Sequence, residues 1–307
     1  MATLFLWIGL IVLILTFLII DLGVFNRIPH VISVKEALKT SLVWISLALL
    51  FNLFIWYEKG AEPALSFFTG YLLEKLLSLD NMFLFVVIFN TFEILPRHQH
   101  RILFWGVLGA IIFRLLFILL GLKLIEMFSW TMYLFGAALI YSAYKIYRKK
   151  GKPVDIENNT LILMVKKWLP LRENYKGRRF FLLINGKWFA TPTFLVLLII
   201  EVCDIIFAID SIPAIFAITL DPFIVFTSNI FAILGLRSLY FLLANIIPRF
   251  YYLQHALAVI LGFIGIKLVL ANHFKIPLAL SLGVVGITLL IAIVASFWKD
   301  KYVKKTD

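Results

Sequence analysis

Long, continuously apolar runs dominate this chain and restrict what it can fold into. We identify nine of them, and each comes close to or exceeds the roughly 20 apolar residues that a bilayer-spanning helix needs. They cover residues 3–20, 37–57, 65–92, 101–123, 130–147, 193–220, 223–247, 251–271 and 276–297. Strands of a membrane β-barrel alternate apolar and polar residues, and these runs do not. We therefore predict an all-α polytopic membrane protein with about nine transmembrane helices.

The charge of the chain is placed asymmetrically. Charged residues make up only 15% of the chain, yet its net charge is +12, and much of the excess lies in the segment 148–192. Basic loops stay on the cytoplasmic side of a membrane, beside anionic lipid. This distribution places the N-terminus outside and the C-terminus in the cytoplasm, and it argues for a lipid partner rather than nucleic acid.

The third and sixth runs share a pattern of rare polar residues. EKLLSLDN spans Glu74 to Asn81, and DIIFAIDS spans Asp204 to Ser211. Each run is followed by two more, and Arg114 and Arg237 lie near the middle of the fourth and seventh. Repeats of three spans must have opposite orientations, as in many secondary transporters. We predict an inverted repeat of spans 3–5 and 6–8.

The repeat divides the chain into five parts. We expect two N-terminal helices in 1–60, the first repeat in 61–147, a basic cytoplasmic loop in 148–192, the second repeat in 193–272, and a last helix with a basic tail in 273–307. Within the loop, Asn185-Gly186 between apolar residues predicts a short β-hairpin.

Carboxylates inside apolar runs need an explanation, because a charge at the bilayer centre costs about 2.5–3.5 kcal/mol on insertion scales. Residues seven apart share a helix face, so Asp204 lies on the same side as Ser211. Asp80 and Asp210 lie off that stripe, and local unwinding at Pro213 would bring Asp210 toward it. The candidate ligands of a cation are Glu74, Asp80, Asn81, Glu201, Asp204, Asp210 and Ser211.

Oxygen ligands of this kind suit Mn²⁺, Mg²⁺ or Ca²⁺. The alternative is that the acids form structural ion pairs with Lys75, Arg114 and Arg237. For Lys75 we expect an ion pair with a neighbouring carboxylate. The two arginines are either fixed counter-charges or groups that compete for the acids when the cation leaves.

Motifs of enzymes are absent from the sequence. It has no nucleophile motif, phosphate-binding loop or dinucleotide fingerprint, so we expect no enzymatic activity, no permanently bound cofactor and no ATP-driven step. A transporter of this kind would use an ion gradient or the membrane potential, with protons as candidate counter-ions. The single cysteine, Cys203, excludes a cysteine-rich metal site.

Two motifs together resemble the TerC family of integral membrane proteins. They are Glu74 with SLDN, and EVCDIIFAIDSIPA from Glu201 to Ala214. The N-terminal stretch SLVWISLALLFNLFIW is similar to the Alx-type bacterial branch. The resemblance implies Mn²⁺ efflux across a bacterial inner membrane, with the motif acids as ligands. The rival interpretation is a non-transporting membrane scaffold of a tellurium- or stress-resistance complex. The oligomeric state stays open.

Overall fold

The computed structural model is predominantly helical and carries one small β-hairpin. It describes residues 7–14, 16–17, 32–128, 130–148, 170–172, 177, 179–243, 252–271, 273–274 and 276–306. Side chains are described for all of these except Asp80 and residues 300–306. Residues 7–14 and 16–17 are helical and belong to the first expected span.

Helices α2 (Val34–Lys59) and α3 (Ala61–Thr91) follow each other with a single residue between them. Ser33 begins α2 by accepting a hydrogen bond from the N–H of Glu36. Gly60 ends it with φ of 89°, a left-handed value that suits glycine because it has no β-carbon. This tight link allows α3 to pack directly against α2.

Helices α4 (Pro96–Met127) and α5 (Thr131–Arg148) come next. Pro96 opens α4, where its missing N–H removes no helical hydrogen bond. The last turn of α5 holds Lys145 and Arg148, which interact favourably with the negative end of the helix dipole.

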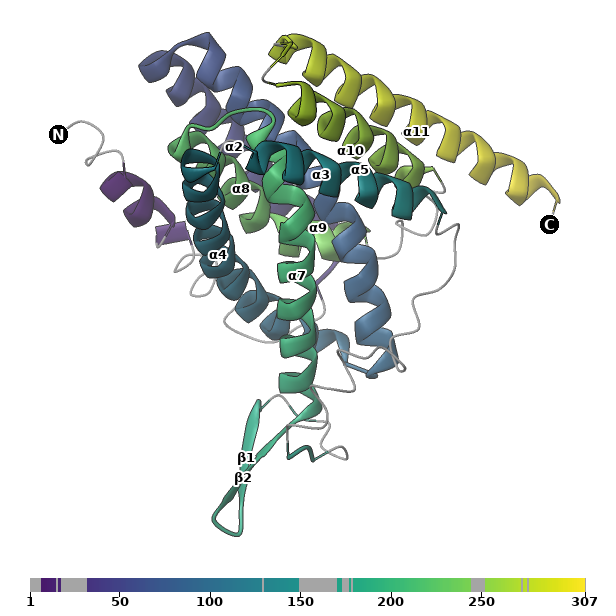
Figure 1. Cartoon of the computed structure of the whole chain (residues 1–307). Helices are drawn as coiled ribbons and strands as arrows, with labels where there is room; N and C mark the ends of the chain where they lie inside the picture. Colours follow the sequence, from purple (N-terminus) through teal and green to yellow (C-terminus); the bar gives the residue numbers. More distant parts are fainter. Residues whose placement is uncertain are drawn as a thin grey trace.

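A β-hairpin precedes α7. Strands β1 (Phe181–Ile184) and β2 (Lys187–Ala190) pair antiparallel. Asn185 and Gly186 between them have φ of 49° and 75°, as a two-residue hairpin turn with two left-handed positions requires. The hairpin predicted from Asn-Gly is therefore confirmed, and it projects from the N-terminal end of α7 away from the helices (Figure 1).

Helix α7 (Pro192–Phe216) is continuous. Thr191 caps it by accepting from the N–H of Phe194. Pro213 lies inside the helix, which continues to Phe216, so the expected unwinding at Pro213 is wrong. Two facts explain this: the helix ends within one turn of the proline, and every residue from Ser211 to Phe216 is buried. Packing holds the last turn helical although one hydrogen bond is lost.

The seventh expected span, 223–247, is bent. It consists of α8 (Pro222–Leu234) and α9 (Leu236–Leu243), which meet at Gly235 with an angle of 41°. Asp221 caps α8 by accepting from the N–H groups of Phe223 and Ile224. All residues from Phe223 to Leu234 are buried, so α8 is surrounded by protein.

Two further helices, α10 (Leu253–Leu270) and α11 (Leu278–Thr306), complete the described part. Within it, five helices are long and apolar enough to cross a membrane, namely α2, α4, α7, α10 and α11, or six if α8 and α9 form one bent span. Helix α3 is long but carries Glu74, Lys75 and Asp80, and α5 is rich in tyrosine. A count of nine spans stays a prediction.

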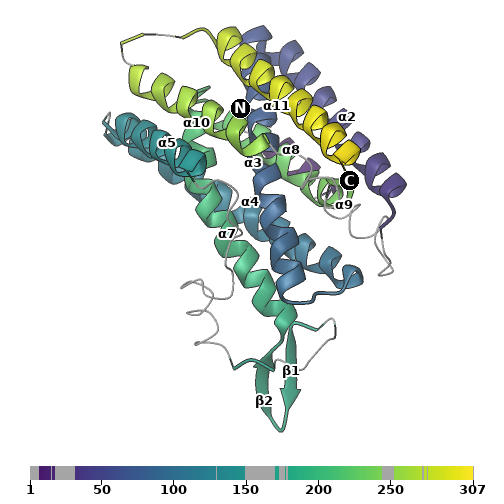
Figure 2. The same cartoon turned by 90° about the vertical axis from the view of Figure 1, so that its right-hand side faces the viewer.

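Three helix pairs make the most extensive contacts in the described part: α3 packs on α8, α4 on α7, and α5 on α10. In Figure 2, α5 and α10 run close together beside α7. Gly136 and Gly265 make this approach possible, because a β-carbon on either would lie 2.9 Å from the carbonyl oxygen of the other. Helices α2 and α11 have only 22% of their apolar stretches buried, as expected of helices that face lipid.

Candidate functional site

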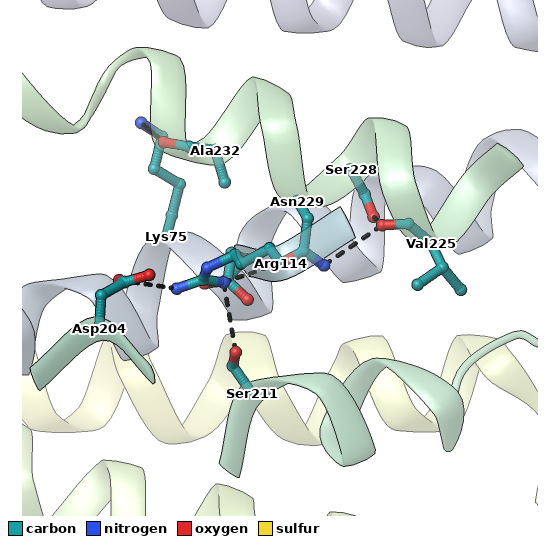
Figure 3. A network of polar contacts seen from close by, with 9 residues as sticks. Lys75, Arg114, Asp204, Ser211, Val225, Ser228, Asn229 and Ala232 are labelled. Atoms are coloured by element: carbon teal, nitrogen blue, oxygen red, sulfur yellow. Dashed lines mark hydrogen bonds and ion pairs between the residues drawn. The ribbon is translucent and has the colours of Figure 1, made fainter. Parts of the chain in front are cut away.

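The largest fully buried side chain described is a charged one, Arg114 on α4, which is 1% exposed. A guanidinium stays protonated in proteins, so a buried one needs polar or anionic partners. Three other helices supply them. We call the group the Arg114 cluster; it consists of Arg114, Glu74 from α3, Asp204 and Ser211 from α7, and Asn229 from α8 (Figure 3).

One nitrogen of Arg114 makes most of the contacts. Nη1 donates to Glu74 Oε1, to Asn229 Oδ1 at 2.8 Å and to Ser211 Oγ at 3.2 Å. Nη2 forms a second ion pair with Asp204 Oδ1 at 3.4 Å. Three oxygen atoms from three helices thus converge on Nη1, and two of the four acceptors of the whole guanidinium belong to carboxylates.

Local packing explains why these side chains meet. Asp204 and Ser211 lie two helical turns apart on the buried face of α7, as their spacing predicted, and both reach Arg114. On α3, Gly70 lies one turn before Glu74, and a β-carbon there would stand 3.0 Å from Ser228 Oγ. The small residue lets α3 approach α8 closely, which brings Glu74 beside Asn229.

Asn229 is a site residue that the sequence interpretation missed. It is 0% exposed, and its Nδ2 donates to the carbonyl of Val225 at 3.2 Å, which leaves Oδ1 for Arg114. Asn229 lies in neither of the two TerC motifs. The available signal was a run of three neutral polar residues, Thr227 to Asn229, inside an otherwise apolar helix.

Asp204 of the cluster and the neighbouring Glu201 each keep one oxygen without a partner among the described residues. Asp204 is 5% exposed, and its Oδ2 is buried with no hydrogen bond to the described residues. The same holds for Oε2 of Glu201, about one turn earlier on α7. The Glu201 carboxylate lies against α4 at Gly109, where a β-carbon would be 2.1 Å from Oε1. Two buried carboxyl oxygens therefore face no donor among the described residues.

A ready-made metal site is not present among the described side chains. No group of three or more His, Cys, Asp or Glu residues lies close enough to hold an ion there. Arg114 stands between Glu74 and Asp204 and forms an ion pair with each, so the cationic position of the cluster is filled by the protein's own guanidinium.

Comparison with known proteins decides the family. The model of the integral membrane protein TerC family matches residues 59–304. The chain belongs to the TerC family. An uncharacterized membrane protein of Myxococcus xanthus is 45% identical over 302 residues, with 98% of this chain and 95% of the relative covered. No solved structure matches.

The resemblance to the Alx branch of the TerC family is also confirmed. “Putative membrane-bound redox modulator Alx” of Salmonella typhi is 44% identical over 302 residues, which cover 95% of this chain and 94% of the relative. The protein of the same name from Escherichia coli K12 is 43% identical over the same length and coverage. The chain is thus an integral membrane protein of the TerC family, and its similarity to these relatives extends over nearly its whole length.

Other basic residues predicted near the TerC motif acids have different partners. Lys75 donates from Nζ to the carbonyl oxygen of Ala232 at 2.8 Å, near the end of α8. In the described part of the chain it forms no ion pair with a carboxylate; because the side chain of Asp80 lies outside that part, the expected ion pair stays a prediction. The free carbonyls at a helix end offer the acceptor that Lys75 uses here. Arg237 is buried on α9 with its guanidinium 5.8 Å from the ring centre of Phe104.

Asp210 lies outside the Arg114 cluster. Its Oδ1 accepts a hydrogen bond from Ser142 of α5 at 2.6 Å, and Lys145, one turn further along α5, acts on it electrostatically. Because α7 stays helical, Asp210 points to a different side from Asp204. The prediction that unwinding joins the two acids in one site is therefore wrong for this conformation.

The remaining TerC motif residues on α3 are Asp80 and Asn81. Asn81 is 3% exposed and lies two turns from Glu74 on the same face. The side chain of Asp80 lies outside the described residues, so its assignment as a ligand stays a prediction.

Proposed function

We propose that the chain is a secondary transporter that exports divalent metal cations, Mn²⁺ first. One observation carries the proposal: oxygens of Glu74, Asp204, Ser211 and Asn229 converge from three helices on a single cationic position. Carboxylate, hydroxyl and amide oxygens are ligands that Mn²⁺, Mg²⁺ and Ca²⁺ accept. The choice of Mn²⁺ and the outward direction rest on the TerC family resemblance.

Arg114 takes the role of a resident counter-charge in this proposal. Buried carboxylates without a cation would be costly, so a transporter that releases its ion must compensate them in another way. Arg114 does this for Glu74 and Asp204. When a divalent ion enters, it displaces the guanidinium; when the ion leaves, Arg114 or protons neutralise the acids. The cycle requires no catalytic chemistry and no bound cofactor.

The transport path would lie between two inverted repeats, residues 61–147 and 193–272, in a chain of about nine spans. The helix pairs support this arrangement. If α3 corresponds to α7 and α4 to α8, a two-fold axis exchanges the α4–α7 contact with the α3–α8 contact, and both contacts exist. The bend at Gly235 adds a discontinuous helix of the kind that transporters use near their sites.

Flux of Mn²⁺ into liposomes that contain the purified protein tests the proposal. Glu74→Gln and Asp204→Asn each remove a charge at the cationic position, and we expect each to slow Mn²⁺ flux by at least about tenfold, the effect of 1.4 kcal/mol. Glu62→Gln is the matched control, because Glu62 is an exposed acid in the first turn of the same helix α3. Unchanged flux in the first two variants would disprove the site.

A non-transporting membrane scaffold is the second candidate. It is favoured by the two ion pairs of Arg114, which would then serve only to hold helices together. In a scaffold, Arg114→Gln combined with Glu74→Gln and Asp204→Asn removes both ion pairs completely and should restore what Arg114→Gln alone removes. The Mn²⁺ content of cells should then not respond to the protein. A transporter should stay inactive in the triple variant.

The name of the Alx relatives, which calls them redox modulators, fits a metal transporter better than a thiol enzyme here. The chain has one cysteine, so it cannot form a disulfide within itself. Movement of a redox-active metal such as manganese would be the route by which this chain influences redox state. We place the chain in a bacterial inner membrane with the basic loop 148–192 in the cytoplasm, because basic loops stay on that side.

A further inference from the structure

We propose that Asn229 is a ligand of the transported cation and sets which cations the site accepts. This inference rests on the transport function proposed above. Its starting point is the contact between Asn229 Oδ1 and Arg114 Nη1 at 2.8 Å, at the same nitrogen that Glu74 and Ser211 approach. An ion at the position of Nη1 would meet the same three oxygens.

The orientation of the Asn229 amide is fixed by the fold. Nδ2 can only donate and Oδ1 can only accept. Nδ2 donates to the Val225 carbonyl within α8, so Oδ1 must face the cluster. Since Asn229 is 0% exposed and its neighbours along α8 are buried as well, the side chain has no room to turn away. A preorganised oxygen of this kind is what a selective ion site needs.

Arg114 is held in the cluster at its tip. Nη1 and Nη2 make the contacts described above, whereas the buried Nε has no hydrogen-bond partner among the described residues. The guanidinium can therefore leave without breaking a hydrogen bond at Nε. Asp204 Oδ2, which is also without a partner there, supplies a further oxygen for an ion that takes the place of Nη1.

Charge distinguishes an amide ligand from a carboxylate at this position. The site has to bind an ion strongly enough to admit it and weakly enough to release it. With a neutral oxygen at Asn229, the carboxylates that contact Arg114 among the described side chains are Glu74 and Asp204. A negative charge at position 229 would attract a divalent ion twice as strongly as it attracts the guanidinium of Arg114. In Asn229→Asp, Arg114 should therefore displace the ion less readily, and the ion should be released more slowly.

Kinetics of Mn²⁺ and Ca²⁺ flux in liposomes test this role. We expect Asn229→Ala to raise the KM for Mn²⁺ about tenfold, as the loss of one charge-assisted contact does, and to change the Mn²⁺-to-Ca²⁺ preference. Asn229→Asp should lower both KM and the maximal rate. Ser228→Ala is the matched control: Ser228 precedes Asn229, is equally buried, and donates only to carbonyls of its own helix.

The outcomes separate the inference from the function on which it rests. If the unaltered protein carries Mn²⁺ and Glu74→Gln stops it, while Asn229→Ala and Asn229→Asp keep the original KM and ion preference, Asn229 is not a ligand. If Asn229→Ala cannot be recovered from membranes, Asn229→Asp alone decides by the same criterion. If the unaltered protein carries no divalent cation at all, the transport function fails and the ligand role with it.

Discussion

Gly109 of α4 lies directly against the carboxylate of Glu201 of α7. A β-carbon at position 109 would stand 2.1 Å from Oε1 and 2.4 Å from both Oε2 and Cδ of Glu201. A β-carbon at position 109 would force the Glu201 carboxylate to move, so the position of Glu201 depends on Gly109. Glu201 has no counterpart in the third span, and this contact gives it a defined place beside Asp204.

Gly109→Ala should therefore destabilise the protein. Overpacking of this kind costs about 1–3 kcal/mol, and combining it with Glu201→Ala should recover most of the loss, because the clashing group is gone. Thermal unfolding of the detergent-purified variants measures both effects. Gly106→Ala is the control: one turn away on α4, its β-carbon would lie 3.3 Å from Ile200 Cγ2, a contact that a small shift relieves. Equal losses in the two alanine variants would contradict the close approach at Gly109.

Arg114→Gln should be among the most damaging single changes. It leaves Glu74 and Asp204 buried without a counter-charge, and breaking a buried ion pair costs about 3–5 kcal/mol. Under the transport proposal, Mn²⁺ should stabilise this variant more than the unaltered protein, because the ion no longer competes with a guanidinium and binding to the folded state raises stability. The check is the melting temperature with and without Mn²⁺. An equal response of both proteins would argue against exchange at that position.

The interface between α5 and α10 depends on two glycines. A β-carbon on Gly136 or on Gly265 meets the backbone carbonyl of the other at 2.9 Å, and a backbone cannot rotate away as a side chain can. Gly136→Ala should force the helices apart at a cost of about 1–3 kcal/mol. Gly262→Ala is the matched control, since its nearest neighbour would be Ala143 Cβ at 3.7 Å. Unfolding in detergent should separate the two variants clearly.

The N-terminus of α8 is joined to α2 through Asp221. Its Oδ1 caps α8, and its Oδ2 lies 3.1 Å from Lys59 Nζ. Asp221→Asn keeps a good cap but loses the ion pair, which is partly exposed and worth about 0–1 kcal/mol. Asp221→Ala loses the cap as well, a further cost of about 0.5–2 kcal/mol. The stability lost with the ion pair should become smaller at high salt, whereas the stability lost with the cap should not. Melting curves at two salt concentrations check this.

The sequence predicted those parts of the site that follow from helix periodicity. Asp204 and Ser211 share a face because they are seven residues apart, and the buried side of an apolar helix is where costly charges must lie. The importance of Arg114 also followed from its position inside an apolar run. Each prediction used the sequence of a single helix, together with either helix periodicity or the cost of a charge in an apolar run. Neither needed knowledge of the packing between helices.

Contacts between helices could not be predicted in this way. Asn229 becomes a site residue because α8 packs on α3 and α4; the polar run Thr227 to Asn229 marks the position but does not show which helices it faces. For Lys75 an acid was the expected partner, and the sequence does not indicate the carbonyl that the end of α8 offers. For Asp210, proline chemistry suggested unwinding, whereas burial of the last turn of α7 keeps it helical. Packing, not local preference, decided all three.

Asp210 and Ser142 should behave as a pair that is independent of the Arg114 cluster in this conformation. Side chains that share a contact show non-additive changes, whereas separated ones add within about 0.3–0.5 kcal/mol. The free-energy changes of Asp210→Asn and Ser142→Ala should therefore be strongly coupled, because the first change alters the acceptor of their 2.6 Å hydrogen bond and the second removes its donor. Asp210→Asn combined with Asp204→Asn should be additive. Chemical unfolding of the single and double variants measures both cycles. Strong coupling between Asp204 and Asp210 would show that the two acids belong to one site.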